Sequence, residues 1–204
     1  MFHPRDRADA DAGAAGGARR HGRVRTEPRL NAERGTTTAP RPPVLVVGVG
    51  SELRRDDAAG RRVVERLRGK LPTDRVELRS VHQLTPELAD EATGRDLLIV
   101  VDASVDATTV TVQNVRAEAT PSAFSHRLDV PALVRLSAAL GAPPAEVVTV
   151  AIPAHDLSIG TDLSPATAHD VAVAADHVIV LCRGSTSRPR GTVAGGGTDG
   201  PGQH

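Results

Sequence analysis

The chain has 204 residues, with 25 basic and 25 acidic side chains, so its formal net charge is zero. This balance gives no electrostatic reason to expect nucleic acid or an anionic membrane as a partner. The single Cys182 excludes an intrachain disulfide framework and a cysteine-rich metal site. No apolar stretch reaches the roughly 18–20 residues that cross a bilayer, and the N-terminus lacks the apolar core of a secretory signal. We therefore expect a soluble, cytoplasmic protein.

The composition divides the chain into three parts. Residues 1–41 and 183–204 are rich in small and charged residues and follow no period of 2 or 3.6. Such segments bury too little apolar area to offset the entropy lost on ordering. We expect a disordered N-terminal extension over 1–41, one folded domain over 42–182 and a disordered, Gly-rich tail over 183–204.

Predicted strands and helices alternate through the folded part. Short apolar runs, typical of strands buried on both faces, occur at Val44–Val47, Val76–Leu78, Leu97–Val101 and Val147–Ile152. Helical spacing or a capping signal predicts helices over Ala58–Lys70, from Thr85–Pro86, over Pro131–Leu140, and from Ser164–Pro165 to about Leu181. Val110–Val115 alternates apolar and polar residues, which indicates an antiparallel edge strand. The alternation predicts an α/β fold, a three-layer α/β/α sandwich with a mainly parallel sheet.

The first predicted strand runs into Gly48–Val49–Gly50 and then into a helix, an order that also occurs in dinucleotide-binding folds. Three features argue against that function. Leu53 replaces the third glycine of the motif, and the second strand ends at Arg79–Ser80 without an acid for the ribose. Asp56 and Asp57 lie where a pyrophosphate would meet the positive end of the helix. We assign Asp56 to a helix-capping role, and look for a further role for Asp57.

Asp102 directly follows the strongest predicted strand. Because ligands bind outside the carboxyl ends of parallel strands, we expect Asp102 close to the loop that carries Asp57. His126 lies in a loop before a predicted helix. Carboxylates with an imidazole and no thiolate suit a divalent first-row metal such as nickel or zinc. Asp57, Asp102 and His126 are therefore the candidate metal-contact residues.

Three segments carry a resemblance to a known family. Gly48–Gly60, Leu98–Ala103 and Ser125–Leu128 resemble the hydrogenase maturation proteases, the endopeptidases that trim the large subunit of nickel–iron hydrogenases. The resemblance extends over the whole folded part, Val44–Leu181. It implies the α/β fold that the strand and helix pattern also predicts.

The resemblance also implies a function for the candidate residues. In that family an acid in the first loop, an Asp after the third strand and a His before a later helix contact nickel. By position these are Asp57, Asp102 and His126, which are then the catalytic residues as well. The nickel is carried by the substrate, and no tightly bound cofactor of the protein's own is expected. The implied reaction removes a C-terminal peptide from the nickel-loaded precursor of a hydrogenase large subunit, without Ser, Cys or zinc machinery.

Some residues depart from the family pattern. Ser51 stands where the family usually has Asn, and Asp57 where it often has Glu. His82 and His155 occur in loops where the family commonly has other residues. Either histidine could supplement the metal site, grip the tail of the substrate or cap a turn. Two other functions also stay open: a non-catalytic chaperone that checks for nickel during hydrogenase assembly, and a small-molecule hydrolase on the same scaffold.

Overall fold

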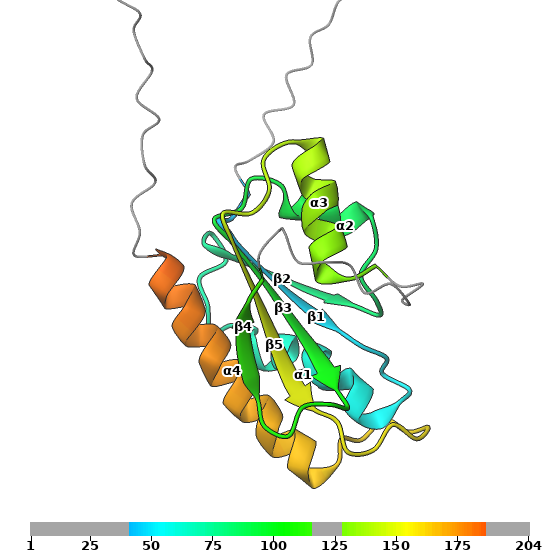
Figure 1. Ribbon diagram of the computed structural model, residues 1–204. Helices are drawn as coiled ribbons and strands as arrows, with labels where there is room; N and C mark the ends of the chain where they lie inside the picture. The colour runs from blue at the N-terminus through cyan, green and yellow to red at the C-terminus, as the bar shows by residue number, and fades with distance from the viewer. Residues whose placement is uncertain (1–40, 116–127, 187–204) are drawn as a thin grey trace, which may run out of the picture. The chain divides into compact units, whose positions relative to one another are not determined.

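The computed structural model describes residues 41–115 and 128–186 (Figure 1). Within these ranges the chain forms a five-stranded sheet, four α-helices and a 3-10 helix. None of these helices is both long and apolar enough to span a membrane. In chain order the elements are β1 (Val44–Val49), η1 (the 3-10 helix, Arg55–Ala58), α1 (Ala59–Leu67), β2 (Val76–Val81), α2 (Glu87–Ala92), β3 (Leu97–Ser104), β4 (Thr111–Asn114), α3 (Val130–Leu140), β5 (Glu146–Pro153) and α4 (Pro165–Thr186).

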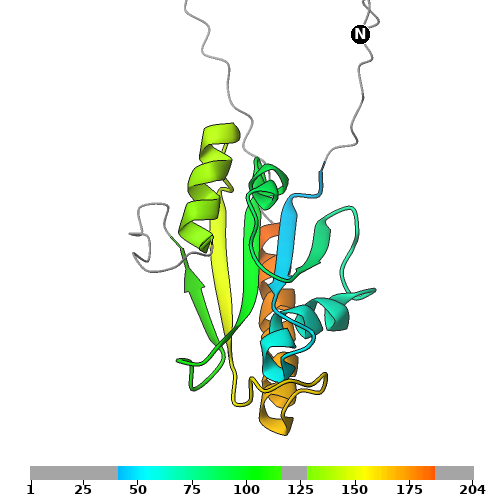
Figure 2. The same ribbon diagram turned by 90° about the vertical axis from the view of Figure 1, so that its right-hand side faces the viewer.

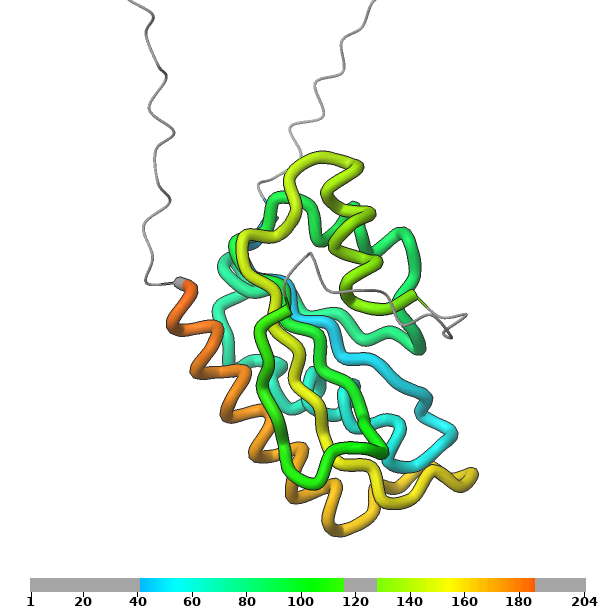
Figure 3. The backbone as a smooth tube through the Cα atoms, viewed as in Figure 1, coloured from blue at the N-terminus to red at the C-terminus, as the bar shows by residue number. Residues whose placement is uncertain are grey.

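The strands lie in the order β2-β1-β3-β5-β4. The first four are parallel to one another, whereas β4 runs antiparallel to β5, with Val112 opposite Val150. Figure 3 traces the chain as it leaves β3, turns and returns as β4. The predicted mainly parallel sheet with an antiparallel edge strand is confirmed.

Two pairs of helices cover the two faces of the sheet. Residues such as Val44 and Val46 pack with α1 and α4, whereas Leu45 and Val47 pack with α2 and α3. Figure 1 shows α2 beside α3, and Figure 2 shows α1 next to α4. Because successive side chains of a strand point to opposite faces, an unbroken apolar run supplies both cores. The predicted three-layer α/β/α sandwich is confirmed.

The third strand is longer than the apolar run that predicts it. It continues past Val101 to Ser104, because it pairs with β5 as far as Pro153. Asp102 therefore lies in the last part of the strand, opposite Ala151, rather than in the loop beyond. Its backbone position is set by the sheet.

The ends of the folded part also differ from those expected. Arg41 forms an ion pair with Asp90 of α2 at 2.7 Å, so the described fold reaches back to this residue. The last helix continues to Thr186, so its final turn occupies residues expected in the tail. Arg183 lies in that turn, where a cation interacts favourably with the helix dipole. Residues 1–40 and 187–204, the rest of the predicted extension and tail, lie outside the described residues.

Two predicted helix starts have different outcomes. Ser164 caps α4, because its hydroxyl oxygen accepts the backbone N–H of Thr167 at 3.3 Å. The helix expected from Thr85 begins at Glu87, and Pro86 before it provides no side-chain cap hydrogen bond. The first cap prediction is confirmed, and the second is wrong by about one residue.

Gly60 allows α1 to lie directly on the sheet. A Cβ atom at this position would be 2.2 Å from the carbonyl oxygen of Val101 and 2.6 Å from that of Val49. Both neighbours are backbone atoms of central strands, so they have little room to move. Gly184 in α4 differs, since a Cβ there would meet no atom within 4 Å.

We predict that Gly60→Ala lowers the free energy of unfolding by about 1–3 kcal/mol, because the backbone must shift to admit the methyl group. Gly184→Ala is the matched control in a second helix. It should leave stability unchanged or raise it by up to about 1 kcal/mol, since alanine is the better helix former. Urea unfolding of both variants measures the difference, and equal stabilities would contradict the prediction.

Candidate active site

The loop after β1 and the loop after β5 are joined by backbone hydrogen bonds. The N–H of Arg55 donates to the carbonyl of Gly160 at 3.0 Å, and that of Gly160 donates to Leu53 at 3.0 Å. The N–H of Asp56 donates to the carbonyl of Asp156 at 3.1 Å. Arg55 has a positive φ of 41°, a conformation unfavourable for a residue with a Cβ atom, and these bonds hold it there. The two loops form one unit at the carboxyl edge of the sheet.

The carboxylate of Asp56 is fully buried in this unit and accepts four hydrogen bonds. Its Oδ2 accepts the N–H groups of His155 at 2.9 Å and Asp156 at 2.8 Å. The hydroxyl of Ser164 donates to Oδ2 at 2.8 Å, and its N–H donates to Oδ1 at 2.7 Å. Burial raises the pKa of this carboxyl, but the hydrogen bonds outweigh burial and lower the pKa to about 2.

Asp56 therefore does not cap its own helix, and that prediction is wrong. The 3-10 helix η1 has no side-chain cap hydrogen bond. The carboxylate instead binds the segment His155–Ser164, which supplies three N–H donors and one hydroxyl. Nothing in the local sequence reveals these donors, since they lie about a hundred residues downstream.

Gly50 lets the second half of η1 pack against the backbone that follows β1. Its φ is +136°, which favours glycine, and a Cβ atom there would be 1.7 Å from the carbonyl oxygen of Asp57. The Gly-x-Gly turn is thus explained by close backbone packing rather than by a phosphate. It positions Asp57 over the end of the first strand.

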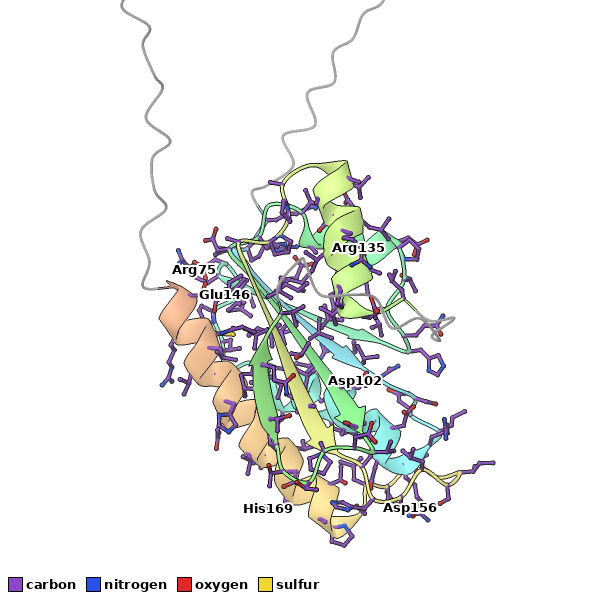
Figure 4. All side chains as sticks on the ribbon, in the orientation of Figure 1. Arg75, Asp102, Arg135, Glu146, Asp156 and His169 are labelled. Carbon is purple, nitrogen blue, oxygen red and sulfur yellow. The ribbon has the colours of Figure 1, made fainter. Side chains whose placement is uncertain are left out.

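A cavity of about 460 Å³ lies at this edge, and Asp57 and Asp102 both line it. The N–H of Ser51 donates to Oδ2 of Asp57 at 2.8 Å, and the N–H of Ala103 donates to Oδ1 of Asp102 at 2.8 Å. Figure 4 labels Asp102 near the end of β3, at the edge of the sheet where the loop with Asp156 lies. The structure brings two of the three predicted site residues to one cavity.

The third predicted residue, His126, lies outside the described residues. Within 41–115 and 128–186, no group of three or more His, Cys, Asp and Glu side chains is arranged to hold a metal ion. Leu128 and Asp129 line the same cavity as Asp57. A metal ion in this cavity would therefore need ligands beyond the two carboxylates of Asp57 and Asp102.

The two histidines at this edge have different surroundings. His82, in the loop after β2, lines the cavity together with Asp57 and Asp102. His155 is exposed and is not among the described residues that line the cavity, and its backbone N–H is bound to Asp56. Only His82 is positioned to contact a ligand there.

Cys182, the single cysteine of the chain, is buried in α4. Burial raises the pKa of its thiol to about 11. A thiol with this pKa is protonated at neutral pH and is a poor nucleophile. Cys182 is therefore not a candidate nucleophile.

Sequence reasoning missed Arg54, which also lines the cavity. The residue belongs to the Gly48–Gly60 segment and precedes Asp57 by three positions. Nothing local distinguishes it from Arg55, its neighbour. Only the folded arrangement shows which of these arginines faces a cavity.

No protein-family model matches the chain, and no curated protein matches it in sequence. Solved structures do match. The hydrogenase-maturating endopeptidase HybD from E. coli is 27% identical, with a TM-score of 0.60 over 70% of this chain and 93% of HybD. An endopeptidase from Escherichia coli, solved in solution, is also 27% identical, with a TM-score of 0.56 over the same shares of the two chains. In fold, the chain is similar to both of these endopeptidases, and the first of them is named for hydrogenase maturation.

A third structure extends this likeness to archaea. The hydrogenase 2 maturation peptidase from Thaumarchaeota archaeon SCGC_AB-539-E09 is 24% identical, with a TM-score of 0.51 over 68% of this chain and 96% of that chain. At this identity the match shows the fold alone. The family resemblance that the sequence predicts is confirmed, and the matched structures are spanned almost in full.

We predict that Asp56→Asn lowers the free energy of unfolding by about 2 kcal/mol at pH 7, because the amide cannot accept all four hydrogen bonds. The pKa in the folded protein, about 2, is below the ordinary value of 3.8. The contribution of the carboxylate is therefore fully present above about pH 4 and is lost as the pH falls toward 2. The difference in the free energy of unfolding between wild type and Asp56→Asn should therefore become smaller as the pH falls from about 4 toward 2.

Denaturant titrations between pH 7 and pH 3 measure this difference. Asp74→Asn is the control, since Asp74 is exposed and should change stability by less than about 0.5 kcal/mol. A difference between Asp56→Asn and wild type that stays constant with pH would contradict the assignment.

Proposed function

We propose that this protein is an endopeptidase that removes a C-terminal peptide from the nickel-loaded precursor of a nickel–iron hydrogenase large subunit. The observation that carries the proposal is the pairing of Asp57 and Asp102 in one cavity, on a fold similar to that of the hydrogenase-maturating endopeptidase HybD. Nickel is cargo of the substrate in this proposal. Its partner is the precursor, and neither nucleic acid nor a membrane takes part.

The two carboxylates suit the proposed contact with nickel. Their oxygens are hard, anionic ligands, and backbone N–H groups orient one oxygen of each. His126 is proposed as the imidazole ligand, which is supported by Leu128, two residues later, on the wall of the same cavity. Two or three contacts make a weak site for free metal. This favours a protein that recognises nickel already bound to a substrate.

The proposed reaction is hydrolysis of one peptide bond. The oxygen of a water molecule bonds to the scissile carbonyl carbon, the C–N bond breaks, and a proton passes to the leaving amine. The substrate's nickel can polarise that carbonyl or lower the pKa of a bound water molecule. Asp57, Asp102 and His126 would hold the ion and the scissile segment at the mouth of the cavity.

The direct test is to mix the purified protein with the nickel-loaded precursor and to measure the precursor's mass. We expect the loss of a C-terminal peptide, and no loss from a precursor without nickel. Asp57→Ala and Asp102→Ala should each slow cleavage by about 100-fold or more, as expected for groups that act on the reacting centre. Asp74→Ala, which changes an exposed aspartate outside the cavity, should cleave at the wild-type rate.

The same experiment separates the protease from a nickel-checking chaperone. Precursor that binds the wild-type protein but keeps its full mass would exclude the protease and support the chaperone. Cleavage that persists in both Asp57→Ala and Asp102→Ala would exclude the proposed site. The unfolding midpoint of each variant shows that a lost activity does not reflect a lost fold.

The two histidines give a matched pair of variants. We predict that His82→Ala slows processing of the nickel-loaded precursor by about 10-fold or more, because His82 lines the cavity with both acids. His155→Ala should have no effect on the rate, because the contact of His155 with Asp56 is made by its backbone N–H. Initial rates measured with both variants test this, and equal rates would contradict a role for His82.

A further inference from the structure

Arg54 lies where two cavities meet. It lines the cavity that contains Asp57 and Asp102, and also a second cavity of about 350 Å³. Asp57 and Ala103 are shared by the two linings, so the cavities adjoin. Arg54 is thus beside a peptide that extends from one cavity into the other.

The backbone of Arg54 is held from three directions. Its N–H donates to the carbonyl of Ser51 at 3.4 Å, and its carbonyl accepts the N–H of Asp57 at 3.0 Å. It also forms an isolated β-bridge with Gly160 in the loop after β5. The base of the side chain is therefore fixed relative to Asp57.

The guanidinium of Arg54 is available to a ligand. Two nearby arginines each form an ion pair: Nε of Arg55 lies 3.4 Å from the carboxylate of Asp156, and Nη2 of Arg61 lies 2.6 Å from that of Glu52. In the described part of the chain, the side chain of Arg54 is exposed and makes no such contact. Its donors are satisfied by water until another acceptor arrives.

Charge distinguishes Arg54 from the other residues of the two cavities. It is the only arginine or lysine among the described residues of either lining. Asp57 and Asp102 can bind a cation but repel anionic oxygens. Among these described residues, Arg54 is therefore the permanently cationic partner for an oxygen that carries negative charge, with planar donors that suit carboxylates and oxyanions.

We propose that Arg54 binds a negatively charged oxygen in the C-terminal segment of the substrate, an inference that rests on the proposed endopeptidase function. The oxygen is either a carboxylate of that segment or the oxyanion that forms at the scissile carbonyl. Asp57 and Asp102 then contact the metal while Arg54 contacts the peptide. These two kinds of oxygen lead to different kinetic expectations. A carboxylate is charged before the reaction, whereas the oxyanion is charged only during it.

Arg54→Gln removes the charge and keeps a polar side chain of similar reach. We expect kcat/KM for the nickel-loaded precursor to fall about tenfold or more. A rise in KM with kcat unchanged identifies the carboxylate, and a fall in kcat identifies the oxyanion. Arg54→Lys should restore only part of the activity, since an ammonium group lacks the planar donors.

Arg66→Gln is the matched control, because Arg66 in α1 is exposed and is absent from both linings. If the wild type cleaves and Arg54→Gln equals Arg66→Gln in kcat and KM, the inference is overturned while the proposed function stands. If the wild type binds the precursor without cleaving it, the affinities of the two variants for the precursor test the contact with Arg54. Weaker binding by Arg54→Gln alone supports the contact, and equal binding overturns it. A wild type that neither binds nor cleaves the precursor overturns both.

Discussion

The arrangement of the carboxyl edge depends on the buried carboxylate of Asp56. An ionised carboxyl group without partners in a protein interior would cost several kcal/mol, and it would take up a proton instead. Here its oxygens accept three backbone N–H groups and the hydroxyl of Ser164, and the pKa falls to about 2. Ser164 also caps α4. One charged group therefore sets the course of the loop after β5 and the start of the helix that covers one face of the sheet.

The same contact explains how two adjacent aspartates have separate environments. Asp56 and Asp57 lie in a 3-10 helix, in which consecutive side chains are about 120° apart. When Asp56 is drawn into the interior by its donors, Asp57 is left on the wall of the cavity. The positive φ of Arg55 sets the entry into this turn, and the hydrogen bond from its N–H to Gly160 holds it. The loop after β5 thus stabilises both the strained backbone of Arg55 and the buried charge of Asp56.

Sequence periodicity predicts the layers of this fold better than the contacts at its edge. The run Val44–Val47 shows a strand buried on both faces, because no half-exposed strand would keep four apolar residues in succession. Asp57 and Asp102 could be placed at one edge because parallel strands end there together. The role of Asp56 could not, since its donors are 99 to 108 residues away in the chain. The different surroundings of His82 and His155 could not be predicted from the sequence either. Long-range packing decides which loop residue faces a cavity.

Asp57 has a shorter side chain than the Glu that is frequent at this position of the resembling family. The location of its carboxylate therefore depends more closely on the position of η1. A Glu has one more rotatable bond and could adjust its reach to a metal, whereas an Asp carboxylate stays close to its backbone. In this chain the N–H of Ser51 holds one oxygen of Asp57, and the carbonyl of Asp57 packs against Gly50. The location of the carboxylate is then set by the two joined loops rather than by a side-chain rotamer. In the proposed function, such a site would require the substrate's metal to be presented at one fixed place, which suits the recognition of an ion already bound in another protein.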